Sequence, residues 1–139
     1  MSQDGKVLMT PYAKSFGLSV FKVKGWNNDI NGVLKRKDGA WSIFTNANHS
    51  EKHRRFVMSL CIADYILHKE AVVYDQLLRN HLSVEQQSSS KQKALNILMP
   101  WDLINHHVSN GIETVEGLAE KMCVSNSAMS IRLGFPFEA

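Results

Sequence analysis

Apolar and small side chains recur every three or four residues between Ser50 and His68, the pattern of a helix that buries one face. The positions at these spacings are Phe56, Ser59, Leu60, Ala63, Ile66 and Leu67. Ser50 is a suitable N-cap, and Glu51 follows in the first turn, where a carboxylate is favoured by the helix dipole. The pattern therefore predicts a buried central helix over 50–68.

Three β-rich runs precede this helix, at 18–24, 32–36 and 40–45. The last two flank Asp38-Gly39, a dipeptide typical of a tight hairpin turn. Trp41, Ile43 and Thr45 alternate along the last run, so a strand would place them on one face. Before the first run, Thr10 and Pro11 predict the start of a short helix.

The pattern after the central helix predicts further helices, at 71–82 and 91–99. The polar residues 82–90 between them predict a flexible connector. In the last part, Thr114 and Ser125 are suitable N-caps for helices over 115–122 and 126–133. With small Ala119, a turn around Cys123 and apolar Val124, residues 114–125 are similar to a helix-turn-helix.

These elements predict an α+β fold, with a small antiparallel or mixed three-stranded sheet packed on helices. The core is expected over 1–99, and a helix-turn-helix-like segment packed on it over 100–139. At 139 residues, 44% apolar and 21% charged, the chain has enough apolar side chains for a packed core. No run of 18 apolar residues predicts a membrane span, and the N-terminus lacks the apolar core of a signal peptide. Cys61 and Cys123 lie in helical patterns, which favours reduced, buried thiols in a cytoplasmic protein.

The net charge of +3 is unevenly distributed, with +6 in residues 1–100 and −3 in residues 101–139. The basic runs are 35–37 and 52–55. Such runs could meet phosphates or an acidic protein. The plainer interpretation is solvated surface, because the runs are short and no aromatic platform is evident beside them.

The flanks of the central helix resemble the zinc-binding helix of the ImmA/IrrE metallopeptidase family. Arg55-Phe56-Val57-Met58-Ser59 matches the residues before the family's H-E-x-x-H, and Tyr65-Ile66-Leu67-His68 those after it. The resemblance extends to 29–34, 38–39 and 43–46 in the predicted sheet and to Ile97-Leu98-Met99-Pro100. It implies a zincin-like core, with a small sheet against two helices and a metal between them.

The family's chemical residues are replaced in this chain. Zinc hydrolysis needs two His one turn apart, a Glu as general base and a third ligand. The H-E-x-x-H positions hold Leu60-Cys61-Ile62-Ala63-Asp64, and the family's third ligand, a Glu, falls on Ser89, with Gln86 and Gln87 nearby. We therefore expect no catalytic residues, no metal ligands and no cofactor, and the degenerate positions are Leu60, Cys61, Asp64 and Ser89.

Two other possibilities for chemistry remain. Cys61, Asp64 and His68 share a helix face and could form a rebuilt metal site, although the plainer interpretation is a buried Cys61 and a pair between Asp64 and His68. The second helix of the helix-turn-helix offers Asn126, Ser127 and Arg132 as nucleic-acid contacts. Arg132 is its one basic residue, and DNA binding draws most of its affinity from Lys and Arg.

The resemblance also implies a partner, because ImmA/IrrE proteins act on helix-turn-helix repressors and relieve repression by cleavage. A member without the zinc ligands can keep the binding surface. We therefore expect an inactive regulator that binds a helix-turn-helix transcriptional repressor through a protein–protein interaction, of the antirepressor type and encoded by a phage or mobile element. One alternative is a transcription regulator that binds DNA through 125–133, and another is a metallopeptidase with a rebuilt metal site.

Overall fold

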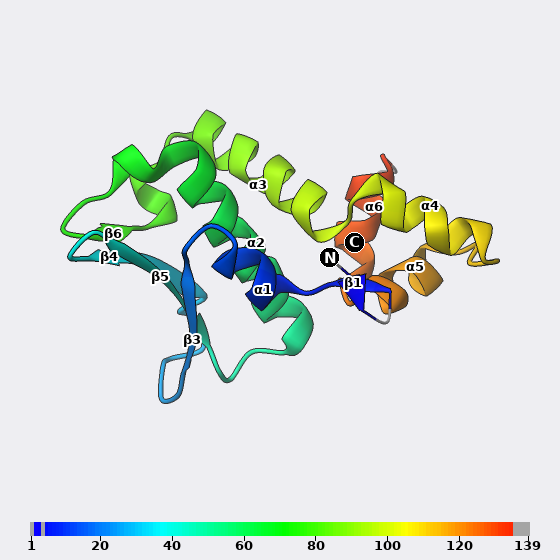
Figure 1. Cartoon of the computed structure of the whole chain (residues 1–139), viewed down its shortest axis with the longest axis horizontal. Helices are drawn as coiled ribbons and strands as arrows, with labels where there is room; N and C mark the ends of the chain where they lie inside the picture. The colour runs from blue at the N-terminus through cyan, green and yellow to red at the C-terminus, as the bar shows by residue number, and fades with distance from the viewer. Residues whose placement is uncertain (1, 4, 135–139) are drawn as a thin grey trace.

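Helix α2 (Glu51–His68) runs through the middle of the computed structural model, and the other elements are arranged around it (Figure 1). The structure describes residues 2, 3 and 5–134. The elements before α2 are β1 (Ser2–Gln3), β2 (Lys6–Val7), α1 (Met9–Lys14), β3 (Ser19–Val23), β4 (Gly32–Lys37) and β5 (Ala40–Asn46). Those after it are η1 (Lys69–Ala71), β6 (Gln76–Leu77), η2 (Arg79–His81), α3 (Val84–Leu98), α4 (Trp101–Ser109), α5 (Val115–Met122) and α6 (Asn126–Leu133).

The main sheet is mixed, with strand order β3-β5-β4-β6. Strand β3 pairs with β5 in parallel, and the other pairs are antiparallel. The predicted hairpin is confirmed: β4 and β5 are joined through Asp38 and Gly39, both with positive φ. Trp41 and Ile43 lie on the inner face, where the Trp41 ring meets Tyr65 of α2 edge to face, with ring centroids 5.4 Å apart.

Gly32 lets α2 pack directly on the sheet. A Cβ at this position would lie 2.5 Å from Cγ1 of Val57 and 2.9 Å from the backbone oxygen of Phe44. Neither distance is compatible with a side chain, so a glycine is needed where α2 crosses β4. The opposite side of α2 packs on α3, and α4 to α6 lie at the far end of the molecule, beyond the sheet (Figure 1).

The central helix forms where the pattern predicts, with the Ser50 hydroxyl accepting a hydrogen bond from the backbone N–H of His53. The expected buried face is only partly right. Ser59 and Ala63 are buried, but Leu67 is 40% exposed and Arg55 is buried. The sheet, α3 and the C-terminal helices cover α2 on several sides, so a single apolar stripe does not describe its burial.

Two predictions between α2 and α3 are wrong. Residues 71–82 are not a helix, because they hold β6, which adds a fourth strand to the expected three, and the turn η2. Residues 84–90 are not a flexible connector but the first half of α3. Ser83 and Gln86 form a capping box that starts this helix, a local signal that outweighs the polar composition.

The other helices differ less from prediction. Helix α1 begins at Met9 after the N-cap Leu8, so Thr10 lies inside the helix instead of capping it. Thr114 and Ser125 cap α5 and α6 as predicted, and Cys123 adopts the left-handed conformation that ends α5.

The predicted division of the chain at residue 100 stays a prediction, and the last five residues of its second part, 135–139, lie outside the described part of the chain. No helix within the described residues has the length and hydropathy of a membrane span.

A buried arginine joins three parts of the fold. The guanidinium of Arg55, which is 6% exposed, donates hydrogen bonds to the backbone oxygens of Val7 at 2.7 Å and of Met122 and Cys123 at 3.2 Å. It thereby holds β2 and the C-terminal end of α5 against α2, and a cation is favoured at that end of a helix. The expectation that 52–55 is solvated surface is therefore wrong for Arg55.

Replacing Arg55 by Met should lower the free energy of unfolding by about 3 kcal/mol or more, because it leaves three buried carbonyl groups without a charged donor. Urea unfolding followed by circular dichroism measures this change. Lys52→Met is the matched control, since Lys52 is exposed on the same helix and makes one long ion pair, 3.7 Å from Glu120. Equal losses in the two variants would contradict the proposed role of Arg55.

Candidate functional site

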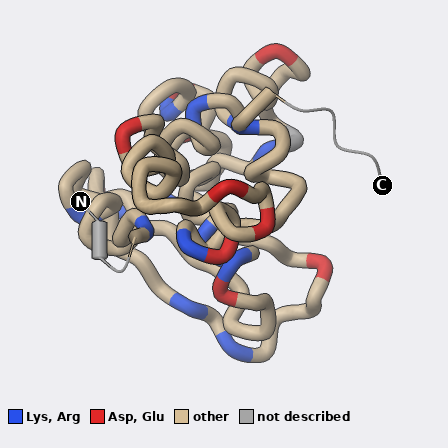
Figure 2. Tube along the Cα trace, turned by 90° about the vertical axis from the view of Figure 1, so that its right-hand side faces the viewer, with Lys and Arg blue, Asp and Glu red and all other residues tan. Residues whose placement is uncertain are grey.

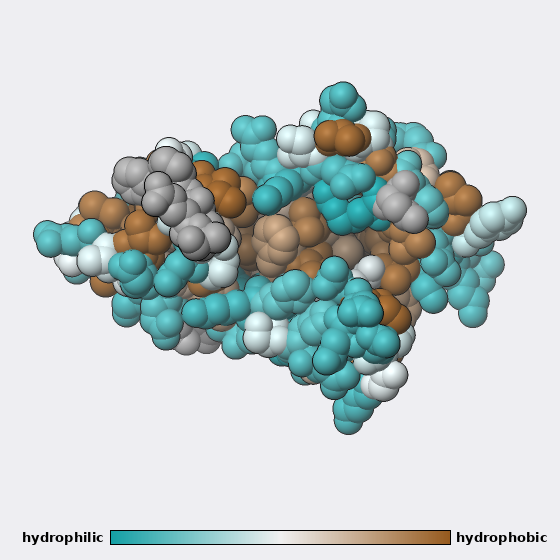
Figure 3. Space-filling model, turned by 180° about the vertical axis from the view of Figure 1, so that it is seen from behind, coloured by the Kyte–Doolittle hydropathy of each residue, from teal (hydrophilic) through white to brown (hydrophobic). Residues whose placement is uncertain are grey.

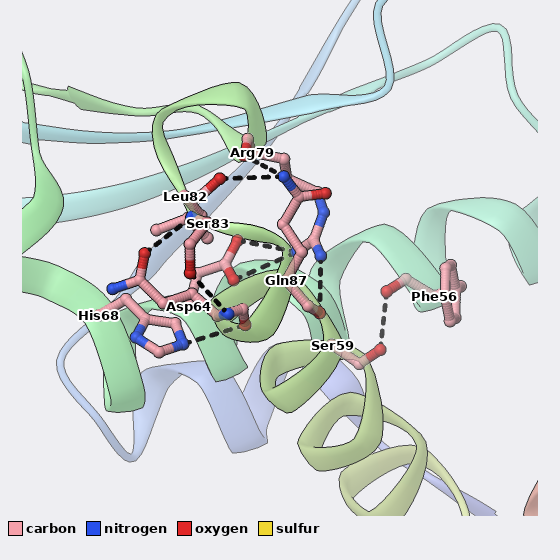
Figure 4. Close-up of polar contacts among 9 residues, drawn as sticks. Phe56, Ser59, Asp64, His68, Arg79, Leu82, Ser83 and Gln87 are labelled. Atoms are coloured by element: carbon pink, nitrogen blue, oxygen red, sulfur yellow. Dashed lines mark hydrogen bonds and ion pairs between the residues drawn. The ribbon is translucent and has the colours of Figure 1, made fainter.

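An ion pair occupies the region between α2, α3 and η2 (Figure 4). Asp64 lies on the inner side of α2 and is 3% exposed. Nη1 of Arg79 lies 3.2 Å from Oδ1 and 3.3 Å from Oδ2 of this carboxylate. The Arg79 side chain is about one third exposed, so the pair has a buried anion and a partly solvated cation.

The backbone around the pair is held by further hydrogen bonds. Nη2 of Arg79 donates to the backbone oxygen of Gln87 at 3.0 Å. The Gln87 side-chain amide donates back to the backbone oxygens of Arg79 at 2.9 Å and Leu82 at 3.1 Å (Figure 4). These reciprocal bonds fix η2 on the first turns of α3 and set the position of the guanidinium over Asp64.

The Asp64 carboxyl is in an unfavourable place for a charge. Burial raises its pKa above 3.8, while Ser90, Arg79 and His68 act in the opposite direction and favour the ionised form. The Ser90 hydroxyl is fully buried close to this carboxylate, but it makes no hydrogen bond of ordinary geometry. Arg79 is therefore the one group that contacts Asp64 directly at hydrogen-bond distance within the described residues.

The other predicted residues on α2 are not arranged around Asp64 as a set of metal ligands. Cys61 is buried, and desolvation raises the pKa of its thiol to about 12, so the thiol is neutral at physiological pH. The expected pair between Asp64 and His68 is wrong, because Nε2 of His68 lies 3.1 Å from the backbone oxygen of Gln86 and Asp64 binds Arg79. Leu60 is half-buried and lines an adjacent pocket.

Two neighbouring serines of α3 lie on different sides of that helix. Ser89 is exposed on α3, whereas Ser90 is the residue that lies against Asp64. Arg79 was not predicted as a site residue, because the pattern over 71–82 predicts a continuous helix in place of β6 and η2. The sequence shows only that a basic residue stands between the two helices. Which acid this residue pairs with is seen only in the folded chain.

A zinc ion does not fit these residues. Among the described residues, no three His, Cys, Asp or Glu side chains come together. Around Asp64 stand the positive guanidinium of Arg79, the apolar Leu60 and a neutral thiol, and a cation already contacts both carboxylate oxygens. A Zn²⁺ ion needs at least three donors and would be repelled by Arg79.

An apolar groove leads away from this ion pair. A pocket of about 100 Å³ beside the ion pair is lined by Gly32 of β4, by Leu77 of β6 and by Phe56, Leu60 and other residues of α2. A second pocket, of about 310 Å³, shares His53 and Phe56 with the first and reaches Leu98, Val124 and Ala128. We call the two together the groove, and Figure 3 shows it as an apolar hollow between polar rims.

The candidate nucleic-acid contacts lie at a different place, on α6. Arg132 is engaged within the molecule: its Nε donates to the backbone oxygen of Met99 at 2.8 Å, and its guanidinium lies 4.3 Å from the centre of the Trp101 ring. Asn126 is exposed, and the Ser127 hydroxyl lies 3.2 Å from that of Ser125. Red and blue segments are mixed over this end of the molecule, which Figure 2 views directly.

Comparisons with known proteins show the family and the fold of this chain. The sequence profile of the IrrE N-terminal-like domain matches residues 13–134, so the chain belongs to this family. No curated relative matches the chain. Among solved structures, a Mycobacterium tuberculosis transcriptional regulator has a similar fold, with a TM-score of 0.65 and 14% sequence identity. The match covers 91% of this chain and 40% of the regulator's chain.

Removing Arg79 should destabilise the fold more than removing Asp64. Arg79→Met should lower the free energy of unfolding by about 3 kcal/mol, the lower end for a broken buried pair because Arg79 is partly exposed. Asp64→Asn should change it by less than about 1 kcal/mol, since it removes a desolvated charge and leaves a cation that water can reach. Denaturant unfolding at pH 7 measures both.

The double variant Asp64→Asn with Arg79→Met completes this test. It should be more stable than Arg79→Met alone, because no unpaired carboxylate is left buried. Losses that simply add up would contradict a direct pair.

His53 predicts a weakening of the fold at mildly acidic pH. Partial burial, and secondly the neighbouring His49, hold the pKa of His53 below 6.5, and its Nε2 lies 3.0 Å from Oδ1 of Asn31. The unfolded chain therefore binds the proton first, so stability falls as the pH drops through 6.5 to the lower folded pKa. The fall should be small because the ring is largely exposed.

His53→Gln should flatten this pH dependence, measured by melting temperature between pH 7.5 and 5. His81→Gln, at another exposed position, serves as the control. An unchanged pH profile in His53→Gln would contradict the assignment.

Proposed function

We propose that this protein is a catalytically inactive member of its family, and that it regulates transcription by binding a helix-turn-helix repressor in the groove. The observation that carries the proposal is the groove itself: the cleft beside α2 is kept, while the residues that would cut a peptide there are replaced by Leu60, Cys61 and the Asp64–Arg79 pair.

The chemistry of these residues supports the loss of activity. Peptide hydrolysis by a zinc enzyme needs a metal-bound water and a general base. A thiol with a pKa of about 12 does not take a proton from water at neutral pH. Asp64 is held by Arg79 and has no further metal-binding side chains grouped with it in the described part of the chain, so it cannot replace the metal site.

The shape and polarity of the groove support a protein as ligand. Its walls combine Phe56, Val57 and Leu60 of α2 with Leu98 of α3 and Val124 before α6. Apolar grooves with polar rims are typical of protein-binding sites. Strand β6 pairs with β4 at Leu34 and Lys35, so the start of β4 beside the groove offers a backbone edge to an extended segment of a partner.

An antirepressor needs only this binding step. A repressor segment held in the groove would be withdrawn from the repressor dimer or from DNA, and release of the operator would follow by mass action. The expectation that the gene belongs to a phage or mobile element is part of the proposal and rests on the family resemblance. Direct DNA binding is the weaker alternative. The Arg132 side chain already donates a hydrogen bond to the backbone oxygen of Met99 and lies over the Trp101 ring.

The proposal predicts release of DNA without cleavage. Helix-turn-helix repressors encoded beside this gene would be bound to their operator duplexes and titrated with the purified protein, followed by native and denaturing gels. We expect free DNA and intact repressor. Leu60→Lys, which places a charge in the groove, should raise the concentration needed by at least about tenfold.

Val84→Lys is the matched control, because it adds the same charge at a position of α3 that is 79% exposed and outside the groove. Elemental analysis of the purified protein should find no stoichiometric zinc. Repressor fragments or one zinc per chain would favour a peptidase. Salt-sensitive binding of the operator alone, weakened by Arg132→Ala, would favour the DNA-binding alternative.

A further inference from the structure

A second hollow lies on the other side of α2 from the groove. It is open to solvent, has a volume of about 420 Å³, and is lined by the segment from β2 to α1, the inner face of β3 and β5, and the first two turns of α2. On α2 it uses Glu51, Arg54, Arg55 and Met58, whereas the groove uses residues 52, 53, 56, 57, 60, 61 and 64. These two stripes lie on opposite sides of a helix, so the two hollows are separate sites.

The charges around this hollow are unbalanced. Four cations line it, Lys6, Lys22, Arg54 and Arg55, but Glu51 is the one carboxylate among its described lining residues. Glu51 is already paired with Lys6 at 3.0 Å. Three positive charges therefore face a shared space without a carboxylate partner in the described part of the chain.

These three cations differ in how far they are satisfied. Arg55 donates to three backbone oxygens, and Arg54 donates to the backbone oxygen of His49. Lys22 makes no ion pair and no side-chain hydrogen bond with the described residues. Carbonyl groups satisfy donors but do not neutralise charge, so an anion in the hollow would relieve the repulsion.

The rest of the lining sets the kind of anion. It consists of the aliphatic side chains Leu8, Met9, Pro11, Val20 and Met58, with the hydroxyl-bearing Thr10 and Thr45. None of the described lining residues is aromatic, so the lining offers no ring to stack on a nucleobase. The volume is within the range of small-molecule sites, about 300 to 1,000 Å³.

We propose that this cationic hollow binds a small organic anion with an aliphatic body, an aliphatic carboxylate. The carboxylate would accept hydrogen bonds from Lys22 and Arg54, and the hydrocarbon chain would lie against Val20 and Met58. This site is independent of the repressor-binding groove, and its failure would leave the proposed function untouched.

Octanoate is a suitable probe, because it joins a carboxylate to a flexible seven-carbon tail. Titration of the ¹⁵N-labelled protein with octanoate should shift the amide signals of residues around the hollow, such as Val20 and Thr45. 1-Octanol has the same chain without the charge, and acetate has the charge without the chain. Both should bind at least about tenfold more weakly than octanoate.

Matched variants test the positions of charge and chain. Lys22→Ala should weaken octanoate binding at least about fivefold, since it removes a charge-assisted hydrogen bond. Lys24→Ala, two residues along and outside the lining, should change it by less than about twofold. Val20→Trp should fill the hollow and abolish binding, with circular dichroism confirming that the variant is folded.

Three results would overturn the proposal. Equal binding of octanol would show that charge is not recognised, and equal binding of acetate would show an adventitious anion site only. Loss of octanoate binding in Leu60→Lys, with no effect of Lys22→Ala, would place the ligand in the groove instead.

Discussion

The buried guanidinium of Arg55 is the interaction on which the assembly of this fold depends. The three backbone oxygens that accept hydrogen bonds from Arg55 belong to Val7 of β2 and to Met122 and Cys123 at the end of α5, so one side chain of α2 holds both elements. These hydrogen bonds act beside the apolar core that Val7, Met122 and α2 share. Arg55 also satisfies the carbonyl groups at the end of α5, including that of Cys123, which a packed helix end would leave without donors.

The second interaction that matters is the ion pair between the partly exposed Arg79 and the buried Asp64. In a zinc-binding helix, polar side chains are kept in the interior because a metal neutralises and coordinates them. Here one acid, Asp64, is buried, and the Arg79 side chain of the same protein supplies the positive charge. The helix pair α2 and α3 is then packed around an internal ion pair, and an apolar groove lies beside it.

Helix α2 consequently has two different sides. Towards the groove it offers Phe56 and Leu60, and towards the cationic hollow it offers Arg54 and Arg55. A helix that is enclosed along much of its length and carries charge on one stripe has a weak amphipathic pattern, which explains why the predicted buried face was only partly correct. The burial of Leu67 was wrongly expected for the same reason.

The sequence by itself determined what depends on near neighbours in the chain. The Asp38-Gly39 turn, the N-caps Ser50, Thr114 and Ser125, and the altered zinc motif are all readable because each acts within a few residues. Strand β6 could not be predicted from the sequence, because its two residues form a strand only when β4 lies beside them. The partners of Arg55 and Arg79 belong to segments distant in sequence, and which acid or carbonyl a long side chain reaches is decided only when tertiary packing excludes water around it.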